Sequence, residues 1–135
     1  LNAKLDRTEF MPFAPVTLAE DADSCYEQLD GGRFAARYMT MTFRVSEEMR
    51  ARSPGVVHLD GTARPQLLRE ADNPGYHAIL SAYKALTGVP TLINTSFNMH
   101  GEPIVCSPND AVRAFKRSAL PYMAMGPYLV RGGSK

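Results

Sequence analysis

A helix between Asn73 and Gly88 is the feature of this sequence that most constrains its fold. Asn73 has the short polar side chain that caps helices, and Pro74 fits the first helical position, where an N–H would have no partner. Gly88 is a typical residue at a helix end. Between them, large apolar residues recur every three or four positions: Tyr76, Ile79, Leu80, Tyr83 and Leu86. The segment therefore predicts an amphipathic helix with one apolar face.

Two further helices are predicted from their caps. Ser107 and Pro108 repeat the pattern of a polar residue followed by proline, and Asp110 stands at the acceptor position of a capping box. Ser46, followed by two glutamates, starts a short helix that should end before Pro54. The buried side of the helix after Ser107 should consist of Ala111, Val112, Ala114 and Phe115.

Short β-prone segments lie between these helices. Residues 38–45 alternate aromatic or methionine side chains with threonine and arginine, which is typical of a strand. Pro15 favours an edge position for an extended segment at residues 13–18. Further short strands are expected at residues 56–59, 65–69, 91–93, 103–105, 123–125 and 128–130. Because strands and helices interleave, the sequence predicts an α/β fold with a mixed sheet.

The composition indicates one globular domain. The chain has 135 residues, of which 44% are hydrophobic and 21% charged, so it can bury a core, and disorder and a coiled coil are excluded. We expect one domain over residues 1–135, with a mobile tail at residues 131–135. No apolar run is long enough to span a membrane and no secretory leader opens the chain, while the start at Leu1 indicates a fragment or a processed product.

Charge, cysteines and histidines limit the partners. Fifteen basic and fourteen acidic residues give a net charge of +1, which argues against nucleic acid as a partner. Cys25 and Cys106 match no zinc motif, so we expect two buried, reduced thiols in a cytoplasmic protein. No pair of histidines has metal-ligand spacing on a predicted helix, and His77 should face solvent. No metal site is therefore predicted in this chain.

Two basic segments are candidates for an anion site. Residues 60–66, Asp-Gly-Thr-Ala-Arg-Pro-Gln, place Arg64 between two strands, where its guanidinium could hold phosphate or carboxylate oxygens in pairs. The alternative is a surface arginine paired with an acidic neighbour such as Asp60. Near the start of the chain, Lys4 and Arg7 could clamp a polyphosphate or simply form a solvated basic end.

A third polar segment, Asn-Thr-Ser-Phe-Asn at residues 94–98, follows a predicted strand. Ligands of open α/β sheets bind outside the carboxyl ends of the strands. Short hydroxyl and amide groups at that place can hold a phosphate, an amide or a purine edge. The same residues can equally form a hydrogen-bonded turn, so both interpretations stay open on the residues alone.

Three motifs together resemble the C-terminal domain of the nodulation-type O-carbamoyltransferases. They are Phe-Met-Pro-Phe-Ala-Pro at residues 10–15, Val-His-Leu-Asp-Gly-Thr-Ala-Arg-Pro-Gln at residues 57–66, and Asn-Thr-Ser-Phe-Asn at residues 94–98. Gly-Glu-Pro-Ile-Val at residues 101–105, followed by a Ser-Pro-x-Asp helix start, continues the match. The order and spacing hold across nearly the whole chain.

The resemblance implies one part of a two-part enzyme. Family members have an N-terminal Kae1-like domain, absent from this chain, and a C-terminal domain with a YrdC-like twisted sheet flanked by helices. The C-terminal domain makes carbamoyl adenylate from carbamoyl phosphate and ATP, with Mg²⁺ on the phosphates and release of pyrophosphate. The N-terminal domain, which also holds the family's metal ion, transfers the carbamoyl group to a hydroxyl of a nodulation factor, an antibiotic or another natural product. This chain alone would lack complete transfer activity.

The family's site residues can be carried over to matching positions. The resemblance implies catalytic roles for Arg64, in the anion site, and for Ser96, in the Ser-x-Asn signature. It implies binding of substrate and nucleotide by Thr62, Asn94 and Asn98. The chemistry requires Arg64 and the Ser96/Asn98 pair to converge on one hollow that can hold a triphosphate and a small amide-like group.

Two departures from the family pattern lie near the start of the chain. The Lys-x-Arg pair of YrdC domains has its nearest match in Lys4 and Arg7, which are one residue further apart. Met11 stands where many carbamoyltransferases have an arginine, which leaves Arg7 as the expected substitute. These departures motivate an alternative, a non-catalytic accessory domain that keeps the fold and binds a partner domain. A third interpretation, an RNA-binding module, conflicts with the low net charge.

Overall fold

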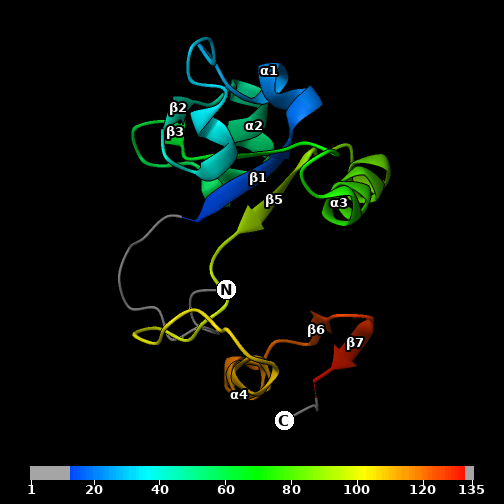
Figure 1. Cartoon of the computed structure of the whole chain (residues 1–135). Helices are drawn as coiled ribbons and strands as arrows, with labels where there is room; N and C mark the ends of the chain where they lie inside the picture. The colour runs from blue at the N-terminus through cyan, green and yellow to red at the C-terminus, as the bar shows by residue number, and fades with distance from the viewer. Residues whose placement is uncertain (1–12, 133–135) are drawn as a thin grey trace. The chain divides into compact units, whose positions relative to one another are not determined.

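The computed structural model describes residues 13–132, which form two compact units (Figure 1). We call residues 13–95 the N-terminal unit and residues 96–132 the C-terminal unit. Each unit contains helices and strands, which confirms the predicted α/β class. Among the described residues, no helix combines the length and the apolar content that crossing a membrane requires.

A three-stranded sheet is the centre of the N-terminal unit. β1 (Ala14–Leu18) lies between β4 (Gln66–Leu68), which is parallel to it, and β5 (Thr91–Asn94), which is antiparallel. The prediction of an edge strand at residues 13–18 was therefore wrong. Pro15 fits a central strand because the ladder with β4 begins one residue later, so no ladder bond depends on its missing N–H.

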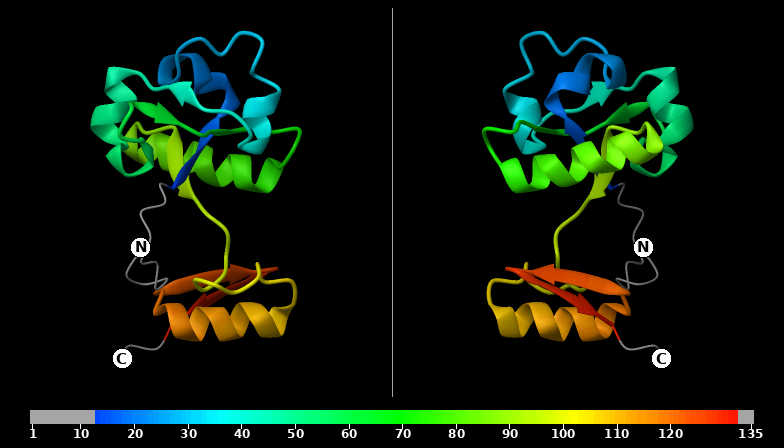
Figure 2. Two further views of the ribbon diagram at one scale, coloured as in Figure 1. Left: turned by 90° about the vertical axis from the view of Figure 1, so that its left-hand side faces the viewer. Right: turned by 90° about the vertical axis from the view of Figure 1, so that its right-hand side faces the viewer.

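One face of this sheet is covered by α3 (Pro74–Thr87), as Figure 2 shows. Val16 and Leu18 of β1 point to this face and pack with Leu68 on β4 and Leu80 on α3. Successive residues of a strand point to opposite faces, so Thr17, which lies between Val16 and Leu18, points to the face away from α3.

The opposite face of the sheet carries the larger hydrophobic core. Its residues come from α1 (Ala22–Cys25), from Met49 on α2 (Glu47–Arg52), and from the short strands, 3-10 helices and loops that connect these elements. η2 (Ala19–Asp21) joins β1 directly to α1. The sheet is thus a middle layer between α3 and this set of short helices.

A buried cluster of hydroxyl groups lies on the face opposite α3. Thr17 Oγ1 is 2.6 Å from the Tyr26 hydroxyl and 2.9 Å from Thr91 Oγ1, and all three residues are buried. Burial raises the pKa of Tyr26, so its phenol stays protonated and can donate a hydrogen bond. The cluster links β1, β5 and the segment after α1.

Residues 38–45 do not form the long strand that their alternation predicts. η3 (Ala35–Tyr38) is followed by Met39, whose φ of 56° is left-handed and ends any extended run. Only β2 (Phe43–Arg44) is a strand, paired antiparallel with β3 (Thr62–Ala63). An alternating sequence alone does not make a strand, because a strand also needs a neighbouring strand to pair with.

Two other predicted strands were also wrong. η4 (Pro54–Val56) and a turn take the place of a strand at residues 56–59, and residues 103–105 are not in a strand. The other four predicted strands are confirmed as β4, β5, β6 (Tyr122–Met125) and β7 (Tyr128–Arg131).

The predicted helix caps are confirmed. Asn73 Oδ1 accepts from the Tyr76 amide at 3.1 Å, and Gly88 is left-handed at the end of α3. The side chains of Ser46 and Ser107 cap α2 and α4 (Pro108–Ser118) in the same way.

The apolar face of α3 is narrower than its periodicity predicts. Leu80 is fully buried, but Ile79 is 63% and Leu86 87% exposed. His77, expected to face solvent, is instead 15% exposed at its side chain, with Nε2 2.9 Å from Glu20 Oε1. The stripe that packs on the sheet consists of Tyr76, Leu80 and Tyr83, and Ile79 and Leu86 lie to one side of it.

The C-terminal unit packs α4 onto the hairpin of β6 and β7. Of the residues expected on its buried side, Ala111, Ala114 and Phe115 are buried and Val112 is partly buried. In the tail expected to be mobile, Arg131 is in β7 and the Gly132 amide donates to a carbonyl oxygen at 2.8 Å. Residues 133–135 lie outside the described residues.

The two cysteines differ in exposure, although both are free thiols as expected. Cys25 is buried, and burial raises the pKa of its thiol. Cys106 is exposed, with Sγ 3.6 Å from Asp110 Oδ2, so the expectation of a buried thiol was wrong there.

We expect Thr17→Val to lower the free energy of unfolding by about 1–3 kcal/mol, because it keeps the shape of the core but leaves buried hydroxyls without their partner. Urea unfolding measures the effect. Thr40→Val is the matched control: its hydroxyl is exposed and donates to Ala35 O, so its cost should stay below about 0.5 kcal/mol. Equal losses in both variants would contradict the role given to the buried cluster.

Candidate functional site

The residues predicted for the site are divided between the two units. The N-terminal unit holds Thr62, Arg64 and Asn94. The C-terminal unit holds Ser96 and Asn98. Lys4 and Arg7 lie outside the described residues. The convergence of Arg64 with the Ser96/Asn98 pair therefore stays a prediction.

A hydrogen-bonded turn holds Thr62 immediately before Arg64. Asp60 Oδ1 accepts from the Thr62 amide at 2.9 Å and from its hydroxyl at 2.7 Å, and His58 Nδ1 is 3.0 Å from the same hydroxyl. The two hydrogen bonds from Thr62 lower the pKa of Asp60, and the bond from the hydroxyl has the larger effect. The observed role of the Thr62 hydroxyl is to shape this turn.

Arg64 is exposed, and its side chain makes no hydrogen bond or ion pair with any residue between 13 and 132. The alternative that it pairs with Asp60 is therefore wrong for the described residues. Its backbone is nevertheless fixed, because the flanking Ala63 and Pro65 are buried and β4 begins directly after them. Arg64 thus presents, from a rigid position, a guanidinium that no residue between 13 and 132 engages.

Asn94 and Gln66 join two of the predicted segments at one end of the sheet. Asn94 Nδ2 donates to Gln66 Oε1 at 2.7 Å. In the ladders, Asn94 is opposite Ala14 and Gln66 is opposite Val16, so the bond reaches across β1 from β5 to β4. Gln66 belongs to the same motif as Arg64, but the sequence predicted no role for it. Its position two residues after Arg64 was the signal that could have identified it as a site residue.

Ser96 and Asn98 form a turn that is closed by their own hydrogen bonds. The Ser96 hydroxyl donates to Asn98 Oδ1 at 2.5 Å, and Asn98 Nδ2 donates to the carbonyl oxygens of Met99 at 3.2 Å and Glu102 at 2.8 Å. The hydrogen-bonded turn that the sequence left open is therefore present. The Ser96 hydroxyl is exposed, and its oxygen keeps lone pairs that can accept from a ligand.

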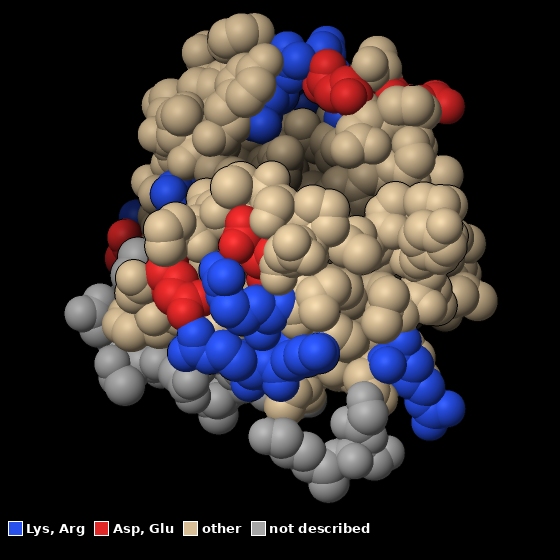
Figure 3. Space-filling view, turned by 60° about the horizontal axis from the view of Figure 1, so that its bottom comes forward, with Lys and Arg blue, Asp and Glu red and all other residues tan. Residues whose placement is uncertain are grey.

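A basic face accompanies this turn in the C-terminal unit. Lys and Arg side chains gather on the side of the unit that carries α4, as Figure 3 shows. Arg113 pairs with Asp110 at 2.9 Å and Arg117 pairs with Glu102, whereas Lys116 makes no ion pair with a described residue. The sequence motifs did not predict this face, although three basic residues within one helix were its signal.

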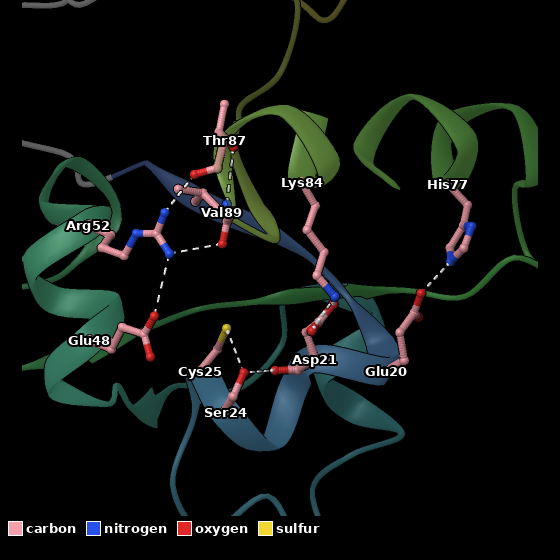
Figure 4. A network of polar contacts seen from close by, with 11 residues as sticks. Glu20, Asp21, Ser24, Cys25, Glu48, Arg52, His77, Lys84, Thr87 and Val89 are labelled. Atoms are coloured by element: carbon pink, nitrogen blue, oxygen red, sulfur yellow. Dashed lines mark hydrogen bonds and ion pairs between the residues drawn. The ribbon is translucent and has the colours of Figure 1, made fainter. Parts of the chain in front are cut away.

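Another polar network, shown in Figure 4, ties α3 to the helices of the opposite layer. Arg52 donates to the carbonyl oxygens of Thr87 at 2.7 Å and Gly88 at 2.9 Å, where a helix end leaves carbonyls unpaired. Lys84 Nζ donates to both carboxylate oxygens of Asp21 at 2.7 and 2.8 Å, which raises the pKa of Lys84. These cations are engaged within the fold and have a structural role.

The described residues contain no group of three or more His, Cys, Asp or Glu side chains that could hold a metal ion.

Comparison with known proteins identifies relatives over almost the whole chain. The family model described as carbamoyltransferase C-terminus matches residues 1–132. The nodulation protein NolO of Bradyrhizobium diazoefficiens is 40% identical over 132 residues, which are 97% of this chain and 24% of that protein. A 3'-hydroxymethylcephem-O-carbamoyltransferase of Amycolatopsis lactamdurans is 35% identical over 126 residues, 93% of this chain and 23% of that protein.

An uncharacterized protein of Methanocaldococcus jannaschii is 38% identical over 130 residues, which are 96% of this chain and 25% of that protein. The chain thus spans about a quarter of the length of these relatives.

We expect Thr62→Val to raise the pKa of Asp60 toward its ordinary value. The variant removes the hydroxyl hydrogen bond, which lowers this pKa more than the bond from the Thr62 amide does. Carboxyl NMR during a pH titration measures the shift. Since the folded pKa of Asp60 is lowered, its stabilising effect is present above the unfolded pKa and is lost as the pH falls through the folded value. The stability difference between variant and parent should therefore become smaller in acid; an unchanged Asp60 titration would contradict the turn.

Proposed function

The chain belongs to the carbamoyltransferase C-terminus family, and we propose that it is the part of a longer carbamoyltransferase that forms carbamoyl adenylate from carbamoyl phosphate and ATP. The relatives named as nodulation and cephem carbamoyltransferase proteins favour a natural-product hydroxyl as the final acceptor. A preceding Kae1-like domain would perform that transfer in the cytoplasm. The C-terminal part would supply the activated carbamoyl group.

The observation that carries this proposal is the guanidinium of Arg64, which has no partner in the described part of the chain. The reaction brings several anionic oxygens together, so it needs positive charge held in place more than it needs a covalent nucleophile. Arg64 has no internal carboxylate to neutralise it among the described residues, and its planar group can bind two phosphate oxygens at once. A rigid backbone on both sides limits the entropy lost when an anion binds.

The amide pair beside Arg64 suits a planar carbamoyl group. Asn94 Nδ2 donates to Gln66, and the carbonyl oxygen of Asn94 points away from Nδ2 within the same planar amide. That oxygen can accept a hydrogen bond from a carbamoyl NH₂. A site with such groups discriminates against analogues that leave them unpaired.

The remaining contacts come from residues of the other segments. Ser96 is only two residues after Asn94 and, with Asn98, would orient the nucleotide or the carbamoyl group. Lys4 and Arg7 would hold the polyphosphate. Mg²⁺ would bind to the phosphates of ATP and neutralise part of their charge.

In the proposed reaction, water first releases inorganic phosphate from carbamoyl phosphate. A carbamate oxygen then attacks the α-phosphorus of ATP, the new P–O bond forms, and pyrophosphate leaves. Arg64 would stabilise the negative charge on the phosphate oxygens as the bonds change. The amides of Asn94 and Gln66 would fix the orientation of the attacking group.

A non-catalytic accessory domain is the second candidate. It is favoured by the turn at Ser96 and Asn98, whose hydrogen bonds are satisfied within the turn itself. In that case the family fold would be kept for contact with a partner domain alone.

We expect Arg64→Ala in the full-length enzyme to slow carbamoyl-phosphate-dependent exchange of pyrophosphate into ATP by about 100-fold or more, because one charged donor to the reacting phosphates is lost. Arg69→Ala is the matched control: Arg69 follows β4 as Arg64 precedes it, but it is paired with Asp72 at 2.6 Å. Wild-type exchange in Arg64→Ala would favour the accessory domain, and circular dichroism checks that both variants fold.

A further inference from the structure

We propose that the free edge of β5 is a docking site for an extended segment of the preceding part of the full-length polypeptide, which would add a fourth strand to the sheet. The proposal rests on the proposed function only in taking this chain as the C-terminal part of a longer protein. It is independent of the adenylate chemistry.

The ladder leaves one side of β5 unpaired. β5 is an outer strand of the sheet, whose order is β4-β1-β5, and Figure 1 shows it beside β1. The Leu18 amide donates to the Pro90 carbonyl at 3.1 Å, which fixes the alternation of hydrogen-bonded pairs in the antiparallel ladder. Leu92 and Asn94 therefore bond to β1, whereas the N–H and C=O groups of Ile93 point outward.

The outer edge of β5 lacks the devices that proteins use to prevent strand addition. Its sequence, Thr-Leu-Ile-Asn, has no charge, and its backbone contains no residue with positive φ. Ile93 is 48% exposed. Natural edge strands are usually blunted by lysine, proline, a bulge or a covering element. An uncharged, partly exposed apolar edge is what strand addition requires.

A cavity of about 490 Å³ runs beside this edge and can take the side chains of an added strand. It is lined mainly by apolar residues of η4, by Tyr83 and by Leu92 and Ile93. Gly55 has no side chain to fill it; a Cβ there would already touch Ile93 Cδ1 at 3.9 Å.

The lining of the cavity argues against an anionic small molecule. Its charged residue, Arg52, already donates to the carbonyl oxygens at the end of α3 and lies 3.4 Å from Glu48 Oε1 (Figure 4). The remaining lining groups are apolar or neutral. The occupant should therefore be an uncharged peptide segment with at least one large apolar side chain.

The relatives indicate where such a segment comes from. The chain covers 19% to 25% of the relatives over which nearly all of it aligns, and the matching family is a C-terminus, so most of their length precedes this region. The described chain begins at Phe13, next to β1, and Ala14 of β1 is paired with Asn94 at the end of β5. The polypeptide before Phe13 is thus joined to the sheet at β1, the strand adjacent to β5.

Residue-resolved hydrogen exchange on the full-length protein, without ATP or carbamoyl phosphate, tests the proposal. If a strand docks, the Ile93 amide should exchange about 100-fold or more slowly than an unstructured amide, like that of Leu92, which is bonded to β1 in any case. I93K should remove the cavity contact and accelerate exchange at residue 93. I79K, which changes an exposed isoleucine on α3, is the matched control and should have no effect at residue 93.

A photo-crosslinking residue at position 93 identifies the occupant. A crosslink to the part of the same molecule before residue 1 supports the proposal. Rapid exchange of the Ile93 amide, or a crosslink to residues 96–135 or to a second copy of the protein, overturns it. Loss of pyrophosphate exchange with Ile93 still protected would instead refute the adenylate chemistry and leave the docking site in place.

Discussion

The burial of β1 on both faces is the constraint on which the candidate site of the N-terminal unit depends. All five residues of this strand are buried, and Thr17 is bonded to the Tyr26 and Thr91 hydroxyls. A slip of one residue would turn every side chain of a strand to the other face. The same register places Gln66 and Asn94 on one face, within reach of each other. Core packing and site geometry are therefore set by one strand.

Features of the fold that depend on neighbouring residues could be predicted from the sequence. Asn73, Ser46 and Ser107 cap their helices as expected, because a cap needs only its own first turn. The strand predicted at residues 38–45 failed because only its last three residues find a partner: Phe43 and Arg44 pair with β3, and Val45 forms an isolated bridge with Tyr26. The central position of β1 could not be predicted, since it depends on β4 and β5, which follow it by about 50 and 75 positions.

The candidate site shows the same division between local and distant contacts. The turn of Ser96 and Asn98 joins residues two positions apart, and a hydrogen-bonded turn was one of the two interpretations that the sequence allowed. The bond between Gln66 and Asn94 joins residues 28 positions apart, so the sequence supplied both groups but not their contact. Arg64 was identified by its motif, and the structure adds that no described residue neutralises it.

Exposure alone does not distinguish Arg64, because a solvated arginine on a surface costs little. Its setting does. Arg69 and Arg52 are held by a carboxylate and by helix carbonyls, whereas Arg64 stands on a fixed backbone two residues from the Gln66–Asn94 bond. Asn94 is also the last residue of β5, whose outer edge is open. A segment docked on that edge would restrict the motion of Asn94 and of Ser96 just after it. Binding of the preceding segment would then also fix the side chains of the proposed site, because both depend on β5.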